Sequence, residues 1–177
     1  MGYDISKISF KGDLAFLSNM HPAAISFLGE ECGLSEELFP FEFDGSKHIS
    51  SEHLYQSLKS HDPKWKALVA STSSAKKVKT LARKHLNKDY AIRDDWAGEV
   101  RIDAMRCAVY LKFIQNPQLA KKLIRLKGTI IEKNCWGDTF WGECEGEGSN
   151  NLGILIMEVR ILLLSMEAAM SEKGFLS

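Results

Sequence analysis

The hydrophobic pattern of this chain changes its period near residue 51, and this change constrains the fold more than any other feature. Before it, short apolar or alternating stretches are separated by turn residues such as Asp44-Gly45, which is typical of hairpins. After it, apolar residues recur mostly at helical spacing. Strands followed by mostly helices, without strict alternation of the two, favour an α+β fold. We therefore predict a helix-dominated single domain with a small antiparallel sheet near the N-terminus.

Turn and cap residues divide these regions into elements. Residues 5–10 alternate loosely, residues 23–28 are apolar, and residues 39–43 predict a strand whose hairpin partner is 47–50. Residues 129–131 predict one more strand, and 137–148 a glycine-rich loop. Helices are expected over 51–60 from a cap at Ser50 or Ser51, from Asp62-Pro63, from a cap at Ser73 or Ser74 to 85, from Trp96 after a cap at Asp94 or Asp95, over 117–128, and from a cap at Asn150 or Asn151 to 170.

Length and charge limit the class of protein. A chain of 177 residues is expected to form one domain over 1–177, with a core at about 8–166 and a short tail at 171–177. Apolar residues make up 45% and charged residues 26%, which is average for a globular protein and argues against disorder. The 23 basic and 23 acidic residues cancel, so a strongly basic nucleic-acid coat protein is unlikely, although a local patch can still bind phosphates.

Nothing in the sequence predicts a membrane span, an export signal or a metal site. The longest apolar stretch, 152–166, is interrupted by a glycine and two charges, and residues 1–10 lack the apolar run of a signal peptide. The five histidines and four cysteines have no zinc-type spacing. We therefore expect four free thiols, no metal, and a cytoplasmic location.

The stretch 51–59 brings three polar side chains together. At 100° per residue, Glu52, Gln56 and Lys59 lie within about 60° of each other on one helix face, opposite Leu54 and Leu58. An acid, an amide and an amine on one surface suggest a site. The alternative is a solvated face with weak ion pairs, which is the commoner fate of such residues.

A second stretch, 132–142, places aromatic residues and Asp138 between glycines. Aromatic side chains in a loop usually plug the edge of a core, but Trp141 could also provide a stacking surface for a base. Gly142 would allow a ligand to approach the backbone closely. Glutamates in the following loop would repel a phosphate, so the amide groups that open the helix at Asn150 are the better candidate for binding one.

Three other features have an ordinary structural interpretation when each is taken alone. Trp96 after two aspartates suggests a cap and a core residue, and residues 16–19 suggest only a turn. Lys76, Lys79 and Arg83 share one side of a helix with Lys77 and Lys84 beside it. This basic face is either a solvated surface or a contact for phosphates.

Six of these stretches carry further information because of their order. They are Phe16-Leu17-Ser18-Asn19; Ser51-Glu52-His53 with Tyr55-Gln56 and Lys59; Trp96; Lys112-Phe113 with Asn116-Pro117; Glu132 with Asp138 and Trp141-Gly142; and Asn150, Leu152, Gly153, Met157 and Arg160. In this order they resemble the signature of the NADAR family, over about 10–163. Residues 20–51 depart from compact members by their length and by extra glutamates, which bears on substrate identity more than on chemistry.

The resemblance implies an enzyme that hydrolyses an N-glycosidic bond at ribose C1′ and needs no cofactor. Two substrates are implied: a phosphorylated ribosylamino-pyrimidine of the riboflavin pathway, or ADP-ribose attached to guanine in DNA. The second would imply an antitoxin role opposite an ADP-ribosyltransferase. The neutral net charge favours the small metabolite and the basic face favours DNA.

The matching positions suggest individual roles. Glu52 matches the catalytic acid, Asp138 is a second carboxylate, and Lys59 is a phosphate ligand, an ion-pair partner or an amine nucleophile. Trp96 and Trp141 would stack on the base or ribose, so we expect Glu52 to lie near residues 96, 138 and 141. Ser18, Asn19, Gln56, Gly142 and Asn150 would complete the substrate-binding residues. The alternatives are a non-catalytic module that binds ADP-ribose or a nucleotide, and a partner-binding protein without such a pocket.

Overall fold

The computed structural model describes residues 10–172, which group into two compact units. The α1 unit is Ser18–Gln115, and the α6 unit combines Met1–Leu17 with Asn116–Ser177. Residues 5–9 of the first expected strand and 173–177 of the expected tail lie outside the described residues. Helices dominate and one small antiparallel sheet is present, which confirms the α+β prediction. The prediction of a single domain stays a prediction.

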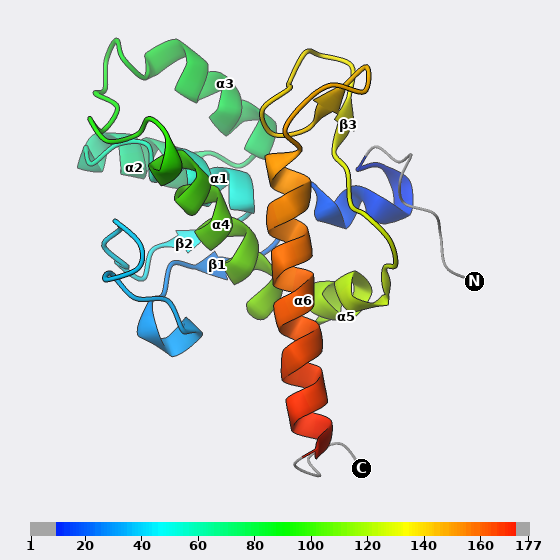
Figure 1. Cartoon of the computed structure of the whole chain (residues 1–177). Coiled ribbons are helices and arrows are strands. Elements are labelled where there is room, and N and C mark those ends of the chain that lie inside the picture. Colours follow the sequence, from blue (N-terminus) through cyan, green and yellow to red (C-terminus); the bar gives the residue numbers. More distant parts are fainter. Residues whose placement is uncertain (1–9, 173–177) are drawn as a thin grey trace. The chain divides into compact units, whose positions relative to one another are not determined.

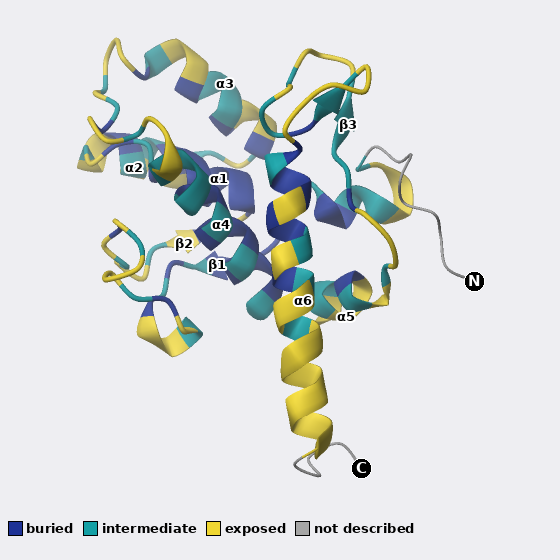
Figure 2. Ribbon diagram, in the orientation of Figure 1, coloured by how far each residue is buried: buried dark blue, intermediate teal, exposed yellow. Residues whose placement is uncertain are grey.

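The α1 unit is built around one short, fully buried helix. All residues of α1 are buried, and this helix packs against α2, α3 and α4 (Figures 1 and 2). The elements of the unit are β1 (Ile25–Ser26), η3 (Glu30–Cys32), β2 (Lys47–His48), α1 (Ser51–Ser57), α2 (Pro63–Ser71), α3 (Ala75–His85) and α4 (Glu99–Ile114).

The antiparallel sheet has a different partner strand from the one expected. β2 begins at Lys47 as predicted, but it pairs with β1, with Ile25 opposite His48. Residues 39–43 form no strand, so that prediction is wrong. The aromatic alternation there instead serves packing, because the Phe41 and Phe43 rings lie 6.5 and 4.8 Å from the ring of Phe27.

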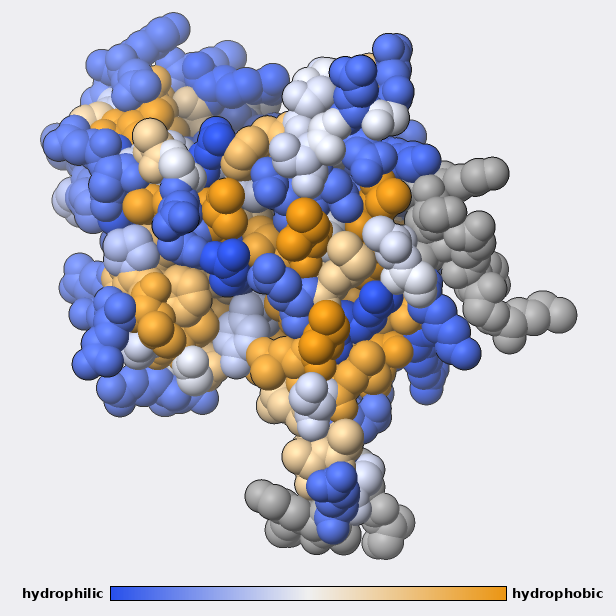
Figure 3. Space-filling model, in the orientation of Figure 1, coloured by the Kyte–Doolittle hydropathy of each residue, from blue (hydrophilic) through white to orange (hydrophobic). Residues whose placement is uncertain are grey.

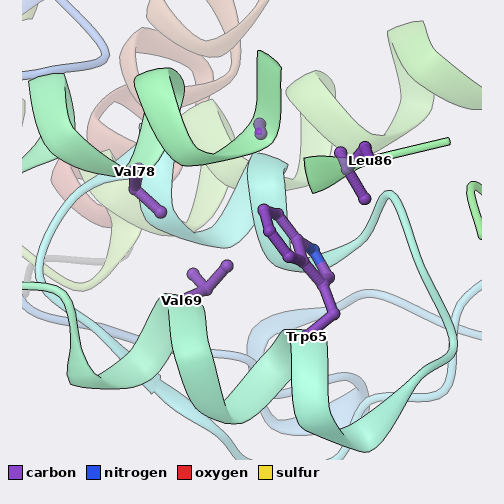
Figure 4. Packing of buried hydrophobic residues seen from close by; sticks show 5 residues of the cluster. Trp65, Val69, Val78 and Leu86 are labelled. Atoms are coloured by element: carbon purple, nitrogen blue, oxygen red, sulfur yellow. The ribbon is translucent and has the colours of Figure 1, made fainter. Parts of the chain in front are cut away.

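A hydrophobic cluster lies between α2 and α3. Trp65, Val69 and Val78 are completely buried, and Ala82 and Leu86 complete the cluster (Figure 4). The indole N–H of Trp65 donates a 2.8 Å hydrogen bond to the carbonyl of Gln56 at the end of α1. The cluster therefore fixes the C-terminal end of α1 as well as supplying buried apolar area. Asp62 and Pro63 start α2 as predicted, with the Asp62 carboxylate accepting from the Lys64 N–H.

Helix α4 starts later than expected, and its cap is different. Gly98, with φ +72°, holds the N-cap position, and the first helical residue is Glu99. The carboxylate of Asp95 is bound by the guanidinium of Arg93, so it does not cap the helix. Trp96 therefore lies in the turn before α4, where Gly98 gives the chain its left-handed bend.

The α6 unit contains the second pair of strands. Its elements are η2 (Gly12–Leu17), α5 (Pro117–Arg125), β3 (Lys133–Asn134), β4 (Glu143–Cys144) and α6 (Asn151–Glu172), and β3 and β4 run parallel. The strand expected at 129–131 is absent, and the next strand, β3, begins at Lys133. The reason is visible at Ile130, whose N–H contacts the Met157 sulfur and whose carbonyl accepts from the side chain of Asn150.

Helix α6 changes character along its length. Leu152, Leu155, Ile156 and Val159 are buried as predicted, whereas Leu163 is only half-buried. Beyond residue 160 the helix is largely exposed (Figure 2), and apolar side chains remain among the polar ones on its surface (Figure 3). Within residues 10–172 no helix is both long and apolar enough to cross a membrane.

The start of α6 depends on Gly153. A Cβ atom there would lie 2.3 Å from the Ile130 carbonyl oxygen and 2.5 Å from the Asn150 side chain. Gly153→Ala should therefore lower the free energy of unfolding by about 1–3 kcal/mol. The steric cost of the added Cβ outweighs the gain of about 1 kcal/mol that alanine brings through its higher helix propensity. Urea denaturation measures the difference, with Ile154→Ala at the exposed neighbouring position as the control. A Gly153→Ala protein as stable as wild type would contradict the observed close packing.

Candidate active site

Helix α1 is fixed at its N-terminus by three residues. The hydroxyl of Ser50 accepts from the backbone N–H of His53 and lies 2.7 Å from His53 Nδ1. His53 Nε2 lies 2.9 Å from the carbonyl of Thr72, so this nitrogen carries the proton and Nδ1 accepts from Ser50. Burial lowers the pKa of His53, which favours this neutral state. The predicted cap at Ser50 is thereby confirmed.

The acid and the amide of α1 bond to each other inside the protein. Gln56 Nε2 donates a 2.7 Å hydrogen bond to Glu52 Oε1, and the two residues are only 3% and 5% exposed. The expected common face is therefore confirmed, whereas the alternative of a solvated face is wrong for Glu52 and Gln56. Gln56 Oε1 is buried, and within the described part of the chain it accepts no hydrogen bond. The Glu52 carboxylate and an unpaired acceptor, Gln56 Oε1, thus belong to neighbouring side chains on this helix.

Lys59 follows the end of α1, and its side chain lies against two aromatic rings. Its ammonium group is 4.8 Å from the Tyr55 ring centre and 5.8 Å from that of Trp96. Burial lowers the pKa of Lys59 to about 8, with Glu52 opposing and Lys79 adding to this effect. At neutral pH the amine is therefore mostly charged, and a modest rise in pH makes it neutral.

Trp96 is placed by the backbone after α3. Its N–H donates to the carbonyl of Arg93, and the N–H of Arg93 donates to the carbonyl of Lys59. The indole is half-buried and lies 5.4 Å from the Tyr55 ring, tilted by 54°. The structure thus brings Trp96 to the Lys59 ammonium, and the predicted stacking on a base stays a prediction.

The Ser18–Asn19 turn is tied to the start of α1. The carbonyl of Asn19 accepts from the N–H of Glu52, and its side-chain N–H₂ contacts the sulfur of Met105. Asn19 Oδ1 is buried and has no hydrogen-bond partner among the described residues. The Ser18 hydroxyl accepts from the N–H of Met20, and its carbonyl accepts from Lys112 Nζ at 2.9 Å. This turn therefore adds a second unpaired acceptor, Asn19 Oδ1, next to the start of α1.

In the α6 unit, Asp138 organises its own turn. Its Oδ1 accepts from the N–H groups of Phe140 and Trp141, and its backbone is held by the Asn134 side chain. Trp141 is half-buried and packs edge-on against Phe140 at 4.8 Å. Trp136, by contrast, is 63% exposed. The convergence of Asp138 and Trp141 with Glu52 stays a prediction, as do their contacts with substrate.

Gly142 and Asn150 have contacts within the chain that differ from those expected. A Cβ at Gly142 would lie 2.2 Å from the Glu132 carbonyl oxygen, so the close approach is to backbone rather than to a ligand. The Asn150 amide bonds to the backbone of Ile130 and Glu132. The N–H groups of Asn150, Asn151 and Leu152 donate to loop carbonyls, so the structure does not bear out an open phosphate site at this helix terminus.

Two residues of the family-like signature, Tyr55 and Lys112, were given no role in the sequence interpretation. Tyr55 forms one side of the Lys59 environment, and its spacing of four residues from Lys59 could have indicated this. Lys112 is 1% exposed, and burial lowers its pKa to about 7. Its position four residues after buried Ala108 was the available signal. Among residues 10–172 no cluster of three metal-ligating side chains occurs.

The arrangement on α1 supports charge stabilisation and hydrogen bonding. Glu52 supplies a fixed carboxylate on a rigid helix, and the buried side-chain oxygens of Asn19 and Gln56, which have no partner among the described residues, can accept hydrogen bonds. Lys59 supplies a cation or, once deprotonated, an amine. A carboxylate beside acceptors suits a sugar that develops positive charge and carries hydroxyl donors.

Comparison with known proteins agrees with this chemistry. The model of the NADAR domain matches residues 10–164. The riboflavin biosynthesis protein VVA0006 of Vibrio vulnificus is 32% identical over 82% of this chain, although the match spans only 34% of that longer protein. The N-glycosidase YbiA of Shigella boydii is 30% identical over 69% of this chain and 74% of its own length.

A solved structure shares the fold. The NMR structure of the Escherichia coli protein YbiA matches 92% of this chain and 85% of its own, with a TM-score of 0.71 at 25% identity. The family model covers most of the chain, and the YbiA relative matches over most of its own length. The chain therefore belongs to the NADAR family.

Proposed function

We propose that this protein hydrolyses the bond between ribose C1′ and the nitrogen of a phosphorylated ribosylamino-pyrimidine related to riboflavin intermediates. The general class, a hydrolase of N-glycosyl bonds, follows from the NADAR family and its YbiA relatives. The choice of substrate is supported by relatives named as riboflavin biosynthesis proteins. The observation that carries the proposal is the buried Glu52 carboxylate, held by Gln56 on α1.

In the proposed reaction the C1′–nitrogen bond breaks and water replaces the nitrogen at C1′. The bonding electrons leave with the nitrogen, which takes up a proton, and positive charge develops on the ribose. Glu52 stabilises that charge and accepts a proton from the attacking water. Asn19 and Gln56 accept hydrogen bonds from the ribose hydroxyls. Asp138 is proposed as the proton donor or a second ribose ligand.

Lys59 is proposed to act as a cation in this reaction. The flanking rings of Tyr55 and Trp96 favour an ammonium group through cation–π contact. A charged Lys59 would attract a substrate phosphate or pair with Glu52. The rival role, attack on an opened sugar by a neutral amine, requires loss of the proton.

A second substrate, ADP-ribose on a guanine base of DNA, has one observation in its favour. Lys76, Lys77 and Lys84 of α3 line a surface pocket of about 560 Å³ together with the hydroxyl groups of residues 71–74. Such a basic surface could contact a DNA backbone. An antitoxin role opposite an ADP-ribosyltransferase would follow only from activity on this substrate.

Incubation of the protein with each substrate separates these functions. We expect ribose phosphate from the ribosylamino-pyrimidine phosphate, detected by mass spectrometry. Release of ADP-ribose from guanine-modified DNA alone would favour the second substrate. Binding of either compound without any product would favour the non-catalytic module and reject hydrolysis.

Glu52→Gln tests the carboxylate. The substitution keeps the shape of the side chain and an oxygen that can accept from Gln56, but it removes the negative charge. We expect kcat to fall by roughly 10²–10⁴-fold with little change in melting temperature. Glu99→Gln, at an exposed glutamate that opens α4, should retain wild-type turnover. Wild-type hydrolysis by Glu52→Gln would remove Glu52 from the mechanism.

The pH dependence tests the charge of Lys59. Because its pKa is lowered to about 8, the cation is lost as pH rises through 8. If the cation is required, kcat/KM should decrease through this range, since this ratio reports groups of the free enzyme. Lys59→Arg should retain activity at higher pH, because a guanidinium stays charged. A kcat/KM that rises through pH 8, with no activity in Lys59→Arg, would instead support the amine nucleophile.

A further inference from the structure

A second pocket, of about 250 Å³, lies between the end of α1 and residues 79–86 at the C-terminal part of α3. Three cationic side chains line it: Lys59 after α1, and Lys79 and Arg83 on α3. Gln56, Ala82, Leu86 and Ile92 form the rest of its described lining, which contains no carboxylate. The spacing of Lys79 and Arg83 puts both on one helix face.

These three cations come together without a neutralising partner of their own. Within residues 10–172, none of them makes an ion pair with a carboxylate. Burial is the main cause of the lowered pKa of Lys59; Glu52 raises this pKa, and repulsion from Lys79 lowers it by a smaller amount. Like charges placed together cost free energy, and an anion in the pocket would relieve that cost.

We infer that this pocket binds the phosphate monoester of a small ribosyl substrate. The inference rests on the proposed function, because Lys59 links the pocket to the helix that carries Glu52. Three cations suit a dianionic monoester better than the singly charged diesters of a nucleic acid. The guanidinium of Arg83 can bind phosphate oxygens in pairs, and Lys79 supplies a point charge.

The size of the pocket supports the same ligand. Sites for whole drug-sized ligands usually enclose about 300–1,000 Å³. A pocket of about 250 Å³ therefore holds one end of a metabolite rather than the whole molecule. A DNA backbone would require several cations in a row. The other lysines of α3 provide such a row, and they line the separate, larger pocket.

The test compares two double variants that remove the same charge from the same helix. Lys79→Gln/Arg83→Gln changes the pocket, and Lys77→Gln/Lys84→Gln changes lysines outside it. Calorimetry at constant ionic strength measures the Kd of ribose 5-phosphate and of inorganic phosphate. We expect the first variant to weaken both on the order of tenfold to a hundredfold, because it removes two of the three cations from the pocket and leaves Lys59 in place. The second variant should bind like wild type.

Equal weakening by both double variants would assign the effect to overall charge and overturn the inference. Failure of the wild-type protein to bind ribose 5-phosphate or inorganic phosphate would also overturn it. The same holds if a short DNA displaces ribose 5-phosphate and this displacement depends on Lys77 and Lys84. These binding measurements do not depend on turnover. Phosphate binding at Lys79 and Arg83 with no hydrolysis would reject the proposed function alone, whereas hydrolysis without this binding would reject only the pocket.

Discussion

Complete burial of a polar helix is the constraint on which the α1 unit depends. A polar group that is buried without a partner costs about 1–3 kcal/mol. Ser50, His53 and Thr72 satisfy the start of α1, and the Trp65 indole satisfies the carbonyl of Gln56 at its end. With both ends held, the Glu52 carboxylate has one defined position, which a catalytic group requires.

Local spacing was sufficient to predict the contacts along α1, but not its environment. Glu52 and Gln56 are four residues apart, so any helix brings them together, and the caps at Ser50 and Asp62 are equally local. The burial of this helix depends on packing against α2, α3 and α4, which extend over residues 63–114. For the same reason, the spacing that placed Lys59 beside Glu52 did not reveal the indole of Trp96 over its ammonium group.

The wrong predictions in the α6 unit depend on contacts between residues that are far apart in the sequence. The β-branched stretch at 129–131 looked like a strand, but the Asn150 amide and Met157 sulfur take the hydrogen bonds of Ile130. Similarly, Gly142 looked like a contact for a ligand, and its freedom is used to pass the Glu132 carbonyl. Such long-range contacts leave no periodic signal in the sequence.

Lys59 connects the two parts of the proposed site. Its charge is opposed by burial and by Lys79, and supported by Glu52 and the two aromatic rings. An anion bound beside Lys79 and Arg83 would raise the pKa of Lys59, and by reciprocity a charged Lys59 would tighten the hold on that anion. Binding of one end of the substrate would then set the charge beside the Glu52 carboxylate before the glycosidic bond breaks. Binding energy from a group remote from the reacting carbon would in this way contribute to the chemical step.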